Sequence, residues 1–307
     1  MKKAGFWRVG ASVVACSIAA AAIAGTGHQW GNYLWDYTYN PNVQKQLKLD
    51  VYYKFSPSSG ATWIAYYNQA LGKWENNSRS PLDLTDRGQA SGTTSLACDH
   101  TNGVVIVCAD QYGTSEGWVG IAEIDAIGND ILWATAKFND SYYSPTSPYA
   151  GTYNNDAQRQ FVACHEIGHT WGLGHLDTSF YNRNKGSCMD YTADPDGGGS
   201  NPDNRNPGTV DWDVLNSSTM YGILSGGKGG GKGGGGGTPN KLDPFEFRSV
   251  GNGPPEGSPS GRFGMIVGYD DEGRPNEYVR YPGGGHERRV FVTWAKGYRP
   301  EHSRNPA

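Results

Sequence analysis

The stretch from residue 164 to residue 175 holds side chains whose types and spacing suit a catalytic metal site. It reads CHEIGHTWGLGH, and two of its histidines, His165 and His169, are four residues apart. On a helix, residues at this spacing lie on the same face, so both imidazoles can bind one ion. Glu166 is rotated by about 100° from His165. Its carboxylate is therefore better placed to reach a water on the metal than to join the ligands.

Gly172 and His175 complete the pattern. Glycine adopts a left-handed backbone at little cost, so Gly172 can end the helix and turn the chain back. His175 then becomes a third nitrogen ligand. Three imidazoles that leave one coordination position open are typical of catalytic zinc, and we therefore expect Zn2+ as the cofactor. Because five positions are fixed together, this interpretation is stronger than that of ordinary surface or core histidines.

A second motif lies downstream, where residues 187–191 read SCMDY. With both motifs the chain resembles the metzincin metallopeptidases, in which the long zinc motif is followed by a methionine-containing turn. The resemblance implies that Met189 packs beneath the three imidazoles, although alone this methionine would be expected only to fill the core. It also implies that Tyr191 binds zinc or stabilises the oxyanion of the transition state. Leu176, which follows the third histidine, matches none of the best-known subfamilies.

The resemblance implies a zinc-dependent endopeptidase that acts on protein or peptide substrates. Zinc lowers the pKa of a bound water, and Glu166 acts as the general base and later protonates the leaving amine. Zinc, with Tyr191, carries the negative charge that develops on the carbonyl oxygen. One alternative is an exported zinc-fold binding or adhesion protein without catalysis, whose active part would be the C-terminal region. Another is a zinc hydrolase that acts on a non-peptide bond.

The N-terminus has the pattern of a secretory signal. Three basic residues within the first eight precede an apolar run from Val9 to Ala24, which is too short and too rich in alanine for a membrane helix. We expect residues 1–24 to be removed before Gly25, which predicts a secreted protein. A lipoprotein signal at Cys16 is the alternative. No other stretch of the sequence is expected to span a membrane.

The cysteines that follow this signal are Cys98, Cys108, Cys164 and Cys188. An even number in an exported chain indicates two disulfides, for which three pairings exist. We favour a bond between Cys98 and Cys108, which would close a hairpin over the turn dipeptide at 102–103. Cys164 would then bond to Cys188 and tie the zinc helix to the methionine turn. Free or metal-binding thiols are the alternative.

Composition argues against a nucleic-acid partner. Lysine and arginine number 26 against 30 aspartates and glutamates, the net charge is −4, and no basic patch is present. The 19 tyrosines and 10 tryptophans suit either a peptide groove or the core. Asp194, Asp196 and Asp203 lie in a polar loop, where we favour solvated carboxylates over a calcium site because EF-hand spacing is absent. We expect a monomer.

The chain divides into five segments. They are the signal at 1–24, a short pro-segment or N-terminal extension at 25–46, the metallopeptidase domain at 47–224, a flexible Gly-rich linker at 225–240, and a C-terminal region at 241–307. The last region is expected to form a small β-rich unit or a tail that orders only on binding. Its strand-like runs are at 263–269, 277–281 and 289–294. The metzincin resemblance does not extend to it.

Hydrophobic periodicity predicts an α+β fold for the main domain. Expected strands are at 48–55, 82–90, 103–109, 118–126 and 131–138, and helices are expected at 58–77 and 210–221 besides the zinc helix. The natural packing is a twisted mixed sheet backed by helices, with the zinc helix below it. Ser58 or Ser59 is expected to cap the first helix, and Asn155 or Asp156 the zinc helix. The metzincin resemblance adds that the last strand before the zinc helix, at 130–139, lines a cleft in which an extended substrate adds as a further strand.

Overall fold

A computed structural model describes residues 28–37, 45–217, 219–222 and 260–305. The expected signal, the alternative lipoprotein cysteine Cys16 and the Gly-rich linker lie outside these residues. The helices are α1 (Pro57–Glu75), α2 (Ala150–Tyr153), α3 (Asp156–Thr170) and α4 (Thr209–Leu215). The strands are β1 (Leu34–Trp35), β2 (Leu47–Phe55), β3 (Leu82–Gln89), β4 (Val104–Asp110), β5 (Trp118–Ile127), β6 (Asp130–Asn139), β7 (Ser260–Gly261), β8 (Gly264–Tyr269), β9 (Pro275–Gly283) and β10 (His286–Trp294).

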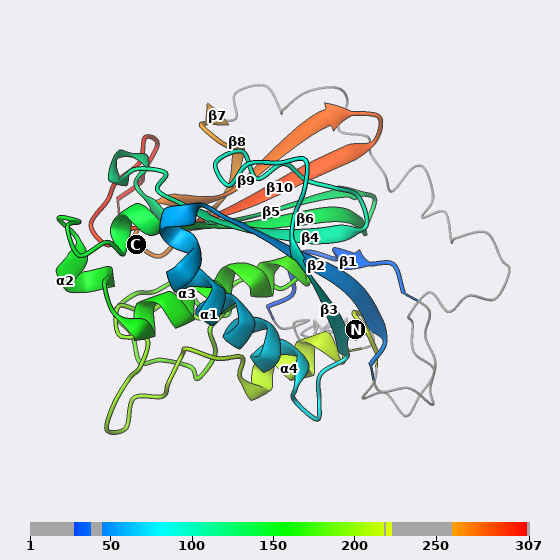
Figure 1. The fold of residues 1–307 in the computed structure, drawn as a ribbon, viewed down its shortest axis with the longest axis horizontal. Coiled ribbons are helices and arrows are strands. Elements are labelled where there is room, and N and C mark those ends of the chain that lie inside the picture. The colour runs from blue at the N-terminus through cyan, green and yellow to red at the C-terminus, as the bar shows by residue number, and fades with distance from the viewer. Residues whose placement is uncertain (1–27, 38–44, 218, 223–259, 306–307) are drawn as a thin grey trace, which may run out of the picture.

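The described strands form one mixed sheet in the order β3-β2-β4-β6-β5-β10-β9-β8-β7, with β1 added beside β6. Strands β3, β2, β4 and β6 are parallel, and β5 is antiparallel to β6. The helices α1, α3 and α4 lie together on one side of this sheet (Figure 1). The fold is therefore α+β, with a large mixed sheet and few helices, as the hydrophobic pattern predicted.

Helix α1 is positioned by its apolar stripe. Its buried side chains recur at three- and four-residue spacing and include Trp63, Tyr67 and Trp74, which places one face against the sheet and α3. The predicted caps were wrong by two to three residues: Ser56 caps the helix by accepting a hydrogen bond from the Ser59 main-chain N–H. Pro57 lies in the first turn of the helix. A main-chain N–H has no helical carbonyl to bond to at this position, so proline is tolerated there.

Strand β6 does not have the position that the resemblance implied for residues 130–139. It lies inside the sheet, between β4 and β5. The hairpin of β5 and β6 turns at 128–129, so β5 is carried past β6 to the outer side. The resemblance implied that the last strand before the zinc helix lines the cleft, but in this hairpin β5, the strand before it, lies on the outer side. The strand that faces the C-terminal residues is β5.

The C-terminal residues 260–305 are not a separate layer. Strand β10 pairs antiparallel with β5 over its whole length, from His286 opposite Ile127 to Trp294 opposite Trp118. Strands β9, β8 and β7 then follow outward in antiparallel order. The strand-like runs predicted in this region are therefore real strands, but they extend the sheet of the main domain.

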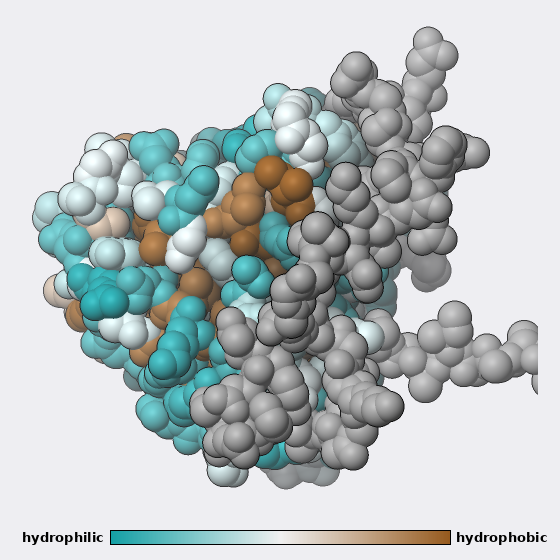
Figure 2. All heavy atoms as spheres, turned by 90° about the vertical axis from the view of Figure 1, so that its right-hand side faces the viewer, coloured by the Kyte–Doolittle hydropathy of each residue, from teal (hydrophilic) through white to brown (hydrophobic). Residues whose placement is uncertain are grey.

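Alternation along β10 divides its side chains between two cores. Phe291 and the following Ala295 belong to the large core on the helix side, whereas Val290, Val292 and Trp294 pack in a second cluster on the opposite face. Large exposed hydrophobic side chains are few in the described chain. On the face shown in Figure 2, the coloured atoms are mostly hydrophilic, with one larger group of hydrophobic atoms and several smaller ones. No helix within the described ranges is long and apolar enough to cross a membrane.

Both predicted disulfides are present, between Cys98 and Cys108 and between Cys164 and Cys188. The hairpin expected over residues 102–103 is absent, because β3 and β4 each pair in parallel with β2 rather than with each other. The first disulfide instead fixes the loop between β3 and β4 against β4. Its cysteines form a small core with Ala90 and Ile106.

Candidate metal centre

Helix α3 carries the first part of the site and begins as predicted. Asn155 caps it by accepting a hydrogen bond from the Gln158 main-chain N–H. The helix ends at Thr170, and Gly172 follows with φ of +91°. A Cβ at Gly172 would lie 2.4 Å from the Tyr33 carbonyl oxygen. Glycine is therefore required there both for the backbone angle and for space.

The turn after Gly172 brings three imidazoles together. One nitrogen from each of His165, His169 and His175 lies within 4.8 Å of the other two, and the Nε2 atoms of His165 and His169 are 3.1 Å apart. The structure thus places the three predicted ligands in one cluster. Their convergence comes from the helical spacing of the first two and from the chain reversal that returns the third.

Hydrogen bonds fix which nitrogen of two of these rings is free. His165 donates from Nδ1 to the Cys188 carbonyl at 2.6 Å, and His169 donates from Nδ1 to the Leu173 carbonyl at 2.7 Å. A carbonyl oxygen only accepts, so each Nδ1 carries the proton and each Nε2 presents a lone pair. In metal sites, a histidine ligand is commonly oriented in this way, by a hydrogen bond from the ring nitrogen that does not bind the metal.

The donor set fits a cation. Burial lowers the pKa of His165 to about 4 and also holds the pKa values of His169 and His175 well below their usual range. The rings are therefore neutral near pH 7, and neutral imidazole is the form that binds metal. The Nε2 atom of His175 is buried with no hydrogen-bond partner in the described chain. Three convergent lone pairs, one of them otherwise unsatisfied, suit a metal ion with nitrogen ligands.

Glu166 lies beside this cluster and is fully buried. Its Oε1 accepts a 2.6 Å hydrogen bond from the Thr293 hydroxyl, while Oε2 has no partner among the described residues. Burial raises the pKa of Glu166 to about 8, and the Thr293 hydrogen bond opposes that rise. Gly120 of β5 makes room for the carboxylate, since a Cβ there would lie 2.2 Å from Oε1.

Met189 packs against the zinc-motif helix at Gly168. A Cβ on Gly168 would lie 2.3 Å from the Met189 sulfur and 2.7 Å from the Trp74 ring. The glycine lies between His165 and His169 in the sequence, so the methionine supports the helical turn that carries both. The sequence pattern supplied Met189 but not the reason for a glycine at this position.

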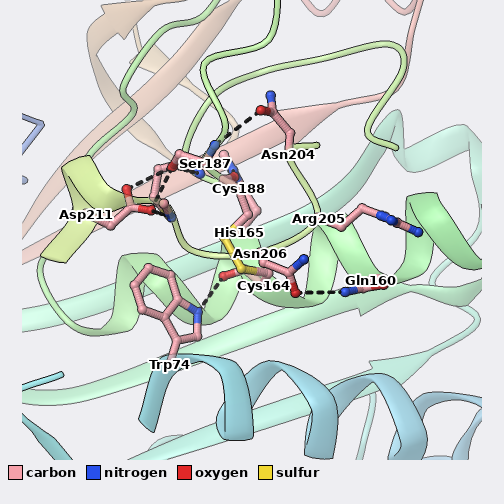
Figure 3. Close-up of a disulfide and its surroundings, with 12 residues drawn as sticks. Trp74, Gln160, Cys164, His165, Ser187, Cys188, Asn204, Arg205, Asn206 and Asp211 are labelled. Carbon is pink, nitrogen blue, oxygen red and sulfur yellow. Dashed lines mark hydrogen bonds between the residues drawn. A yellow bond between two sulfur atoms is a disulfide. The ribbon is translucent and has the colours of Figure 1, made fainter. Parts of the chain in front are cut away.

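The disulfide joins the helix to the methionine turn, as Figure 3 shows. Cys164 and Cys188 have Cα atoms 5.9 Å apart, and the Trp74 indole donates a 3.1 Å hydrogen bond to the Cys164 carbonyl. Both sulfurs are buried in the main core. The main-chain carbonyl of Cys188 also accepts the hydrogen bond from His165 Nδ1. Cys188 therefore both bonds covalently to the helix and orients the His165 ring.

A buried carboxylate fixes the start of the methionine turn. Asp211 of α4 accepts hydrogen bonds from the Ser187 hydroxyl at 2.8 and 2.9 Å and lies 2.7 Å from His28 Nε2 (the Ser187 contacts are drawn in Figure 3). The Ser187 hydroxyl in turn accepts from the Met189 main-chain N–H at 2.9 Å. Neither Asp211 nor His28 could be predicted as part of the site, because nothing in the local sequence links α4 to the N-terminal segment.

Tyr191 is buried within the site. Its ring centroid lies 4.6 Å from that of His175 and 5.5 Å from that of His165, and its hydroxyl accepts from the Asn276 amide at 3.4 Å. Burial raises its pKa above the usual range, so the phenol remains protonated and able to donate a hydrogen bond. The structure therefore brings Tyr191 to the imidazoles, whereas the contact of Met189 is with α3 at Gly168.

Three further residues of the site were not predicted from the sequence: Phe291 and Trp30 pack on the imidazoles, and Thr293 contacts Glu166. The Phe291 ring lies 4.4 Å from the rings of both His169 and His175 and stacks at 4.1 Å on Trp30. Thr293 is the hydrogen-bond donor to Glu166. These residues come from β10 and from the segment before β1, which lie far from the motif in sequence.

Neither protein-family models nor curated protein sequences match this chain.

Proposed function

We propose that residues 47–224 form a zinc-dependent endopeptidase of the metzincin type. The observation that carries the proposal is the convergence of three neutral imidazoles, with Glu166 next to His165 on helix α3. A metal held by His165, His169 and His175 would polarise a water and a substrate carbonyl. This combination of ligands and carboxylate suits hydrolysis of a peptide bond.

Glu166 and Tyr191 would supply the proton chemistry. Glu166 takes a proton from the attacking water and later delivers it to the leaving amine. A cation bound beside Glu166 would lower the raised pKa of this carboxyl and keep it ionised. Its Oε2, which has no partner among the described residues, would then accept that proton. The protonated Tyr191 hydroxyl, near His175, would donate a hydrogen bond to the carbonyl oxygen as negative charge develops there.

A secreted location is part of this proposal. Two disulfides indicate an oxidising compartment, since such bonds do not persist in a reducing cytosol. The signal predicted at residues 1–24 agrees with that compartment.

One observation favours a second function, a zinc-fold binding protein without catalysis. The ligands His165 and His169, Glu166 and Tyr191 have at most 1% of their surface exposed. A peptide cannot reach them while β10 is in place.

The test combines metal content with peptide cleavage. The full chain, loaded with zinc, is incubated with a diverse peptide library, and cut sites are identified by mass spectrometry with and without a chelator. Glu166→Gln should keep one zinc per chain and lose cleavage, because an amide accepts the Thr293 hydrogen bond but is not a base. His169→Ala should lose the zinc. Zinc binding without chelator-sensitive cleavage, in the intact chain and in the opened forms described below, would leave the binding-protein function.

A further inference from the structure

Among the strands that precede helix α3 in the sequence, β5 is the one next to the C-terminal strands. Strand β10 pairs with the edge that β5 would otherwise leave open. Without residues 260–305, β5 would present unpaired main-chain N–H and C=O groups along one side. Such an edge takes up an extended peptide as an additional strand. Strand β10 fills this position antiparallel to β5. Residues 286–293 pair in continuous register, and an irregularity shifts the register before Trp294.

The register of β10 with β5 places two side chains of β10 against Glu166 and the imidazoles. Thr293 lies opposite Gly120 and Phe291 lies opposite Ala122. These two side chains of β10 point to the helix side, where Thr293 bonds to Glu166 and Phe291 covers the imidazoles. The peptide unit between them therefore crosses the site in the manner expected of an extended substrate chain.

Contacts around the site hold the C-terminal strands in this place. The Trp30 indole donates to Glu277 at 2.9 Å, and the Tyr33 hydroxyl donates to Glu287 at 2.6 Å. Asn276 of β9 donates to the Tyr191 hydroxyl at 3.4 Å. The proposed base, the imidazoles and the proposed oxyanion donor are thus each contacted by residues of β9 or β10.

We propose that β10 is an intramolecular inhibitor that occupies the substrate position on β5. This inference rests on the proposed peptidase function. It adds that the substrate binds as an extended chain antiparallel to β5, and that β10 must leave this edge before a substrate enters. The inhibitor belongs to the same chain, which reaches it through residues 223–259, a segment rich in glycine.

A disulfide between the strand ends would lock β10 in place. Ile127 and His286 lie opposite each other at the end of the pair, and Ile127 is 44% exposed. Ile127→Cys/His286→Cys should form a bond that mild reduction reverses, monitored by the mass of thiol-blocked protein. The wild type under the same reductant controls for the native disulfides, whose cysteines are buried.

Two changes would open the site. One is a recognition sequence for a specific protease placed within residues 225–238, so that cutting leaves β10 held only by non-covalent contacts. The other is Phe291→Ala, which removes the ring that covers the imidazoles. Val267→Ala is the matched control, because Val267 is a 42% exposed apolar residue of the same C-terminal strands but lies on β8.

Three readouts separate occlusion from catalysis. Hydrogen exchange at the β5 amides should be slow in the locked chain and faster after the cut. Zinc extraction by a chelator should be about tenfold faster in Phe291→Ala and in the cut chain than in the wild type or Val267→Ala, which corresponds to about 1.4 kcal/mol. Peptide cleavage should be lowest in the oxidised locked form and highest in the cut chain.

The outcomes distinguish the two proposals. Equal exchange, equal zinc extraction and equal cleavage in the locked, intact and cut forms would overturn the inhibitor assignment. Faster exchange and extraction after the cut, with no cleavage in any form, would retain occlusion by β10 and overturn the peptidase function instead.

Discussion

The Nδ1 atom of His165 donates a hydrogen bond to the main-chain carbonyl of Cys188, and the sulfur of Cys188 is bonded to Cys164, the residue before His165. One side chain and one covalent bond therefore connect the same two segments. The position of the methionine turn and the direction of the His165 lone pair are fixed together. Loss of the covalent bond should affect the metal site as well as global stability.

Removing this disulfide should weaken metal binding, whereas removing the other should not. The sequence separations are 24 and 10 residues, so by chain entropy the two bonds stabilise the fold by about 3.5 and about 2.7 kcal/mol. Cys164→Ala/Cys188→Ala and Cys98→Ala/Cys108→Ala should thus lose similar stability. Only the first should lower zinc affinity, by about tenfold, because it frees the partner of His165. Competition titrations would show this, and equal affinities would contradict it.

Gly168→Ala should destabilise the protein although alanine favours helices. The helix gains about 1 kcal/mol from the replacement, but the new Cβ meets Met189 and Trp74 at distances that require movement. We expect a net loss of about 1–3 kcal/mol in unfolding free energy. Gly151→Ala in α2 is the control, since nothing lies within 4 Å of its Cβ. Gly168→Ala should cost less in a Met189→Ala background than in the wild type, and equal costs in the two backgrounds would argue against this contact.

The cluster of three histidines was predictable because its information is local. His165 and His169 share a helical face by spacing alone, and Gly172 must turn the chain before His175 can return. The disulfide pairing was correct, although the hairpin over residues 102–103 from which it was predicted is absent. The cap of α1 was predicted at Ser58 or Ser59, whereas Ser56 is the cap in the structure. Three of the four residues from 56 to 59 are serines, and the side chain of each could accept the capping hydrogen bond.

The covering of the site could not be predicted, because strand order is a long-range property. The periodicity of residues 289–294 indicates a strand but contains no information about its neighbour. Gly120 and Thr293 are far apart in sequence, and only the register of β5 with β10 brings them to Glu166. The misplacement of residues 130–139 has the same cause, since a hairpin can put either of its strands outermost.

The carboxyl of Asp190 should make stability fall as pH rises. Its Oδ2 accepts from Lys185 N–H and the Asn204 amide, while Oδ1 is buried without a partner in the described chain. Burial raises the pKa of Asp190 from 3.8 to about 6. The folded state then holds a proton that the unfolded state releases, so stability is fully present below pH 4 and is lost as pH rises to about 6.

Asp190→Asn should remove this dependence. The amide oxygen can accept both existing hydrogen bonds, and the amide carries no charge. Between pH 4 and pH 7 the wild type should lose about 2–3 kcal/mol more unfolding free energy than the variant, at about 1.4 kcal/mol per pKa unit. Denaturant unfolding at both pH values measures the difference, in which all other groups cancel. Parallel curves for the two proteins would show that the carboxyl is not shifted.

Gly120→Ala should act through Glu166 alone. The new Cβ would meet the carboxylate at 2.2 Å, so either the strand or the glutamate must move. We expect a loss of about 1–3 kcal/mol in stability and loss of chelator-sensitive cleavage in the opened chain, with zinc retained because the three histidines are untouched. In a Glu166→Ala background the clashing group is gone, so the same replacement should cost little. A double-mutant cycle on unfolding free energy measures this coupling, and equal costs in both backgrounds would mean that Gly120 does not set the position of the carboxylate.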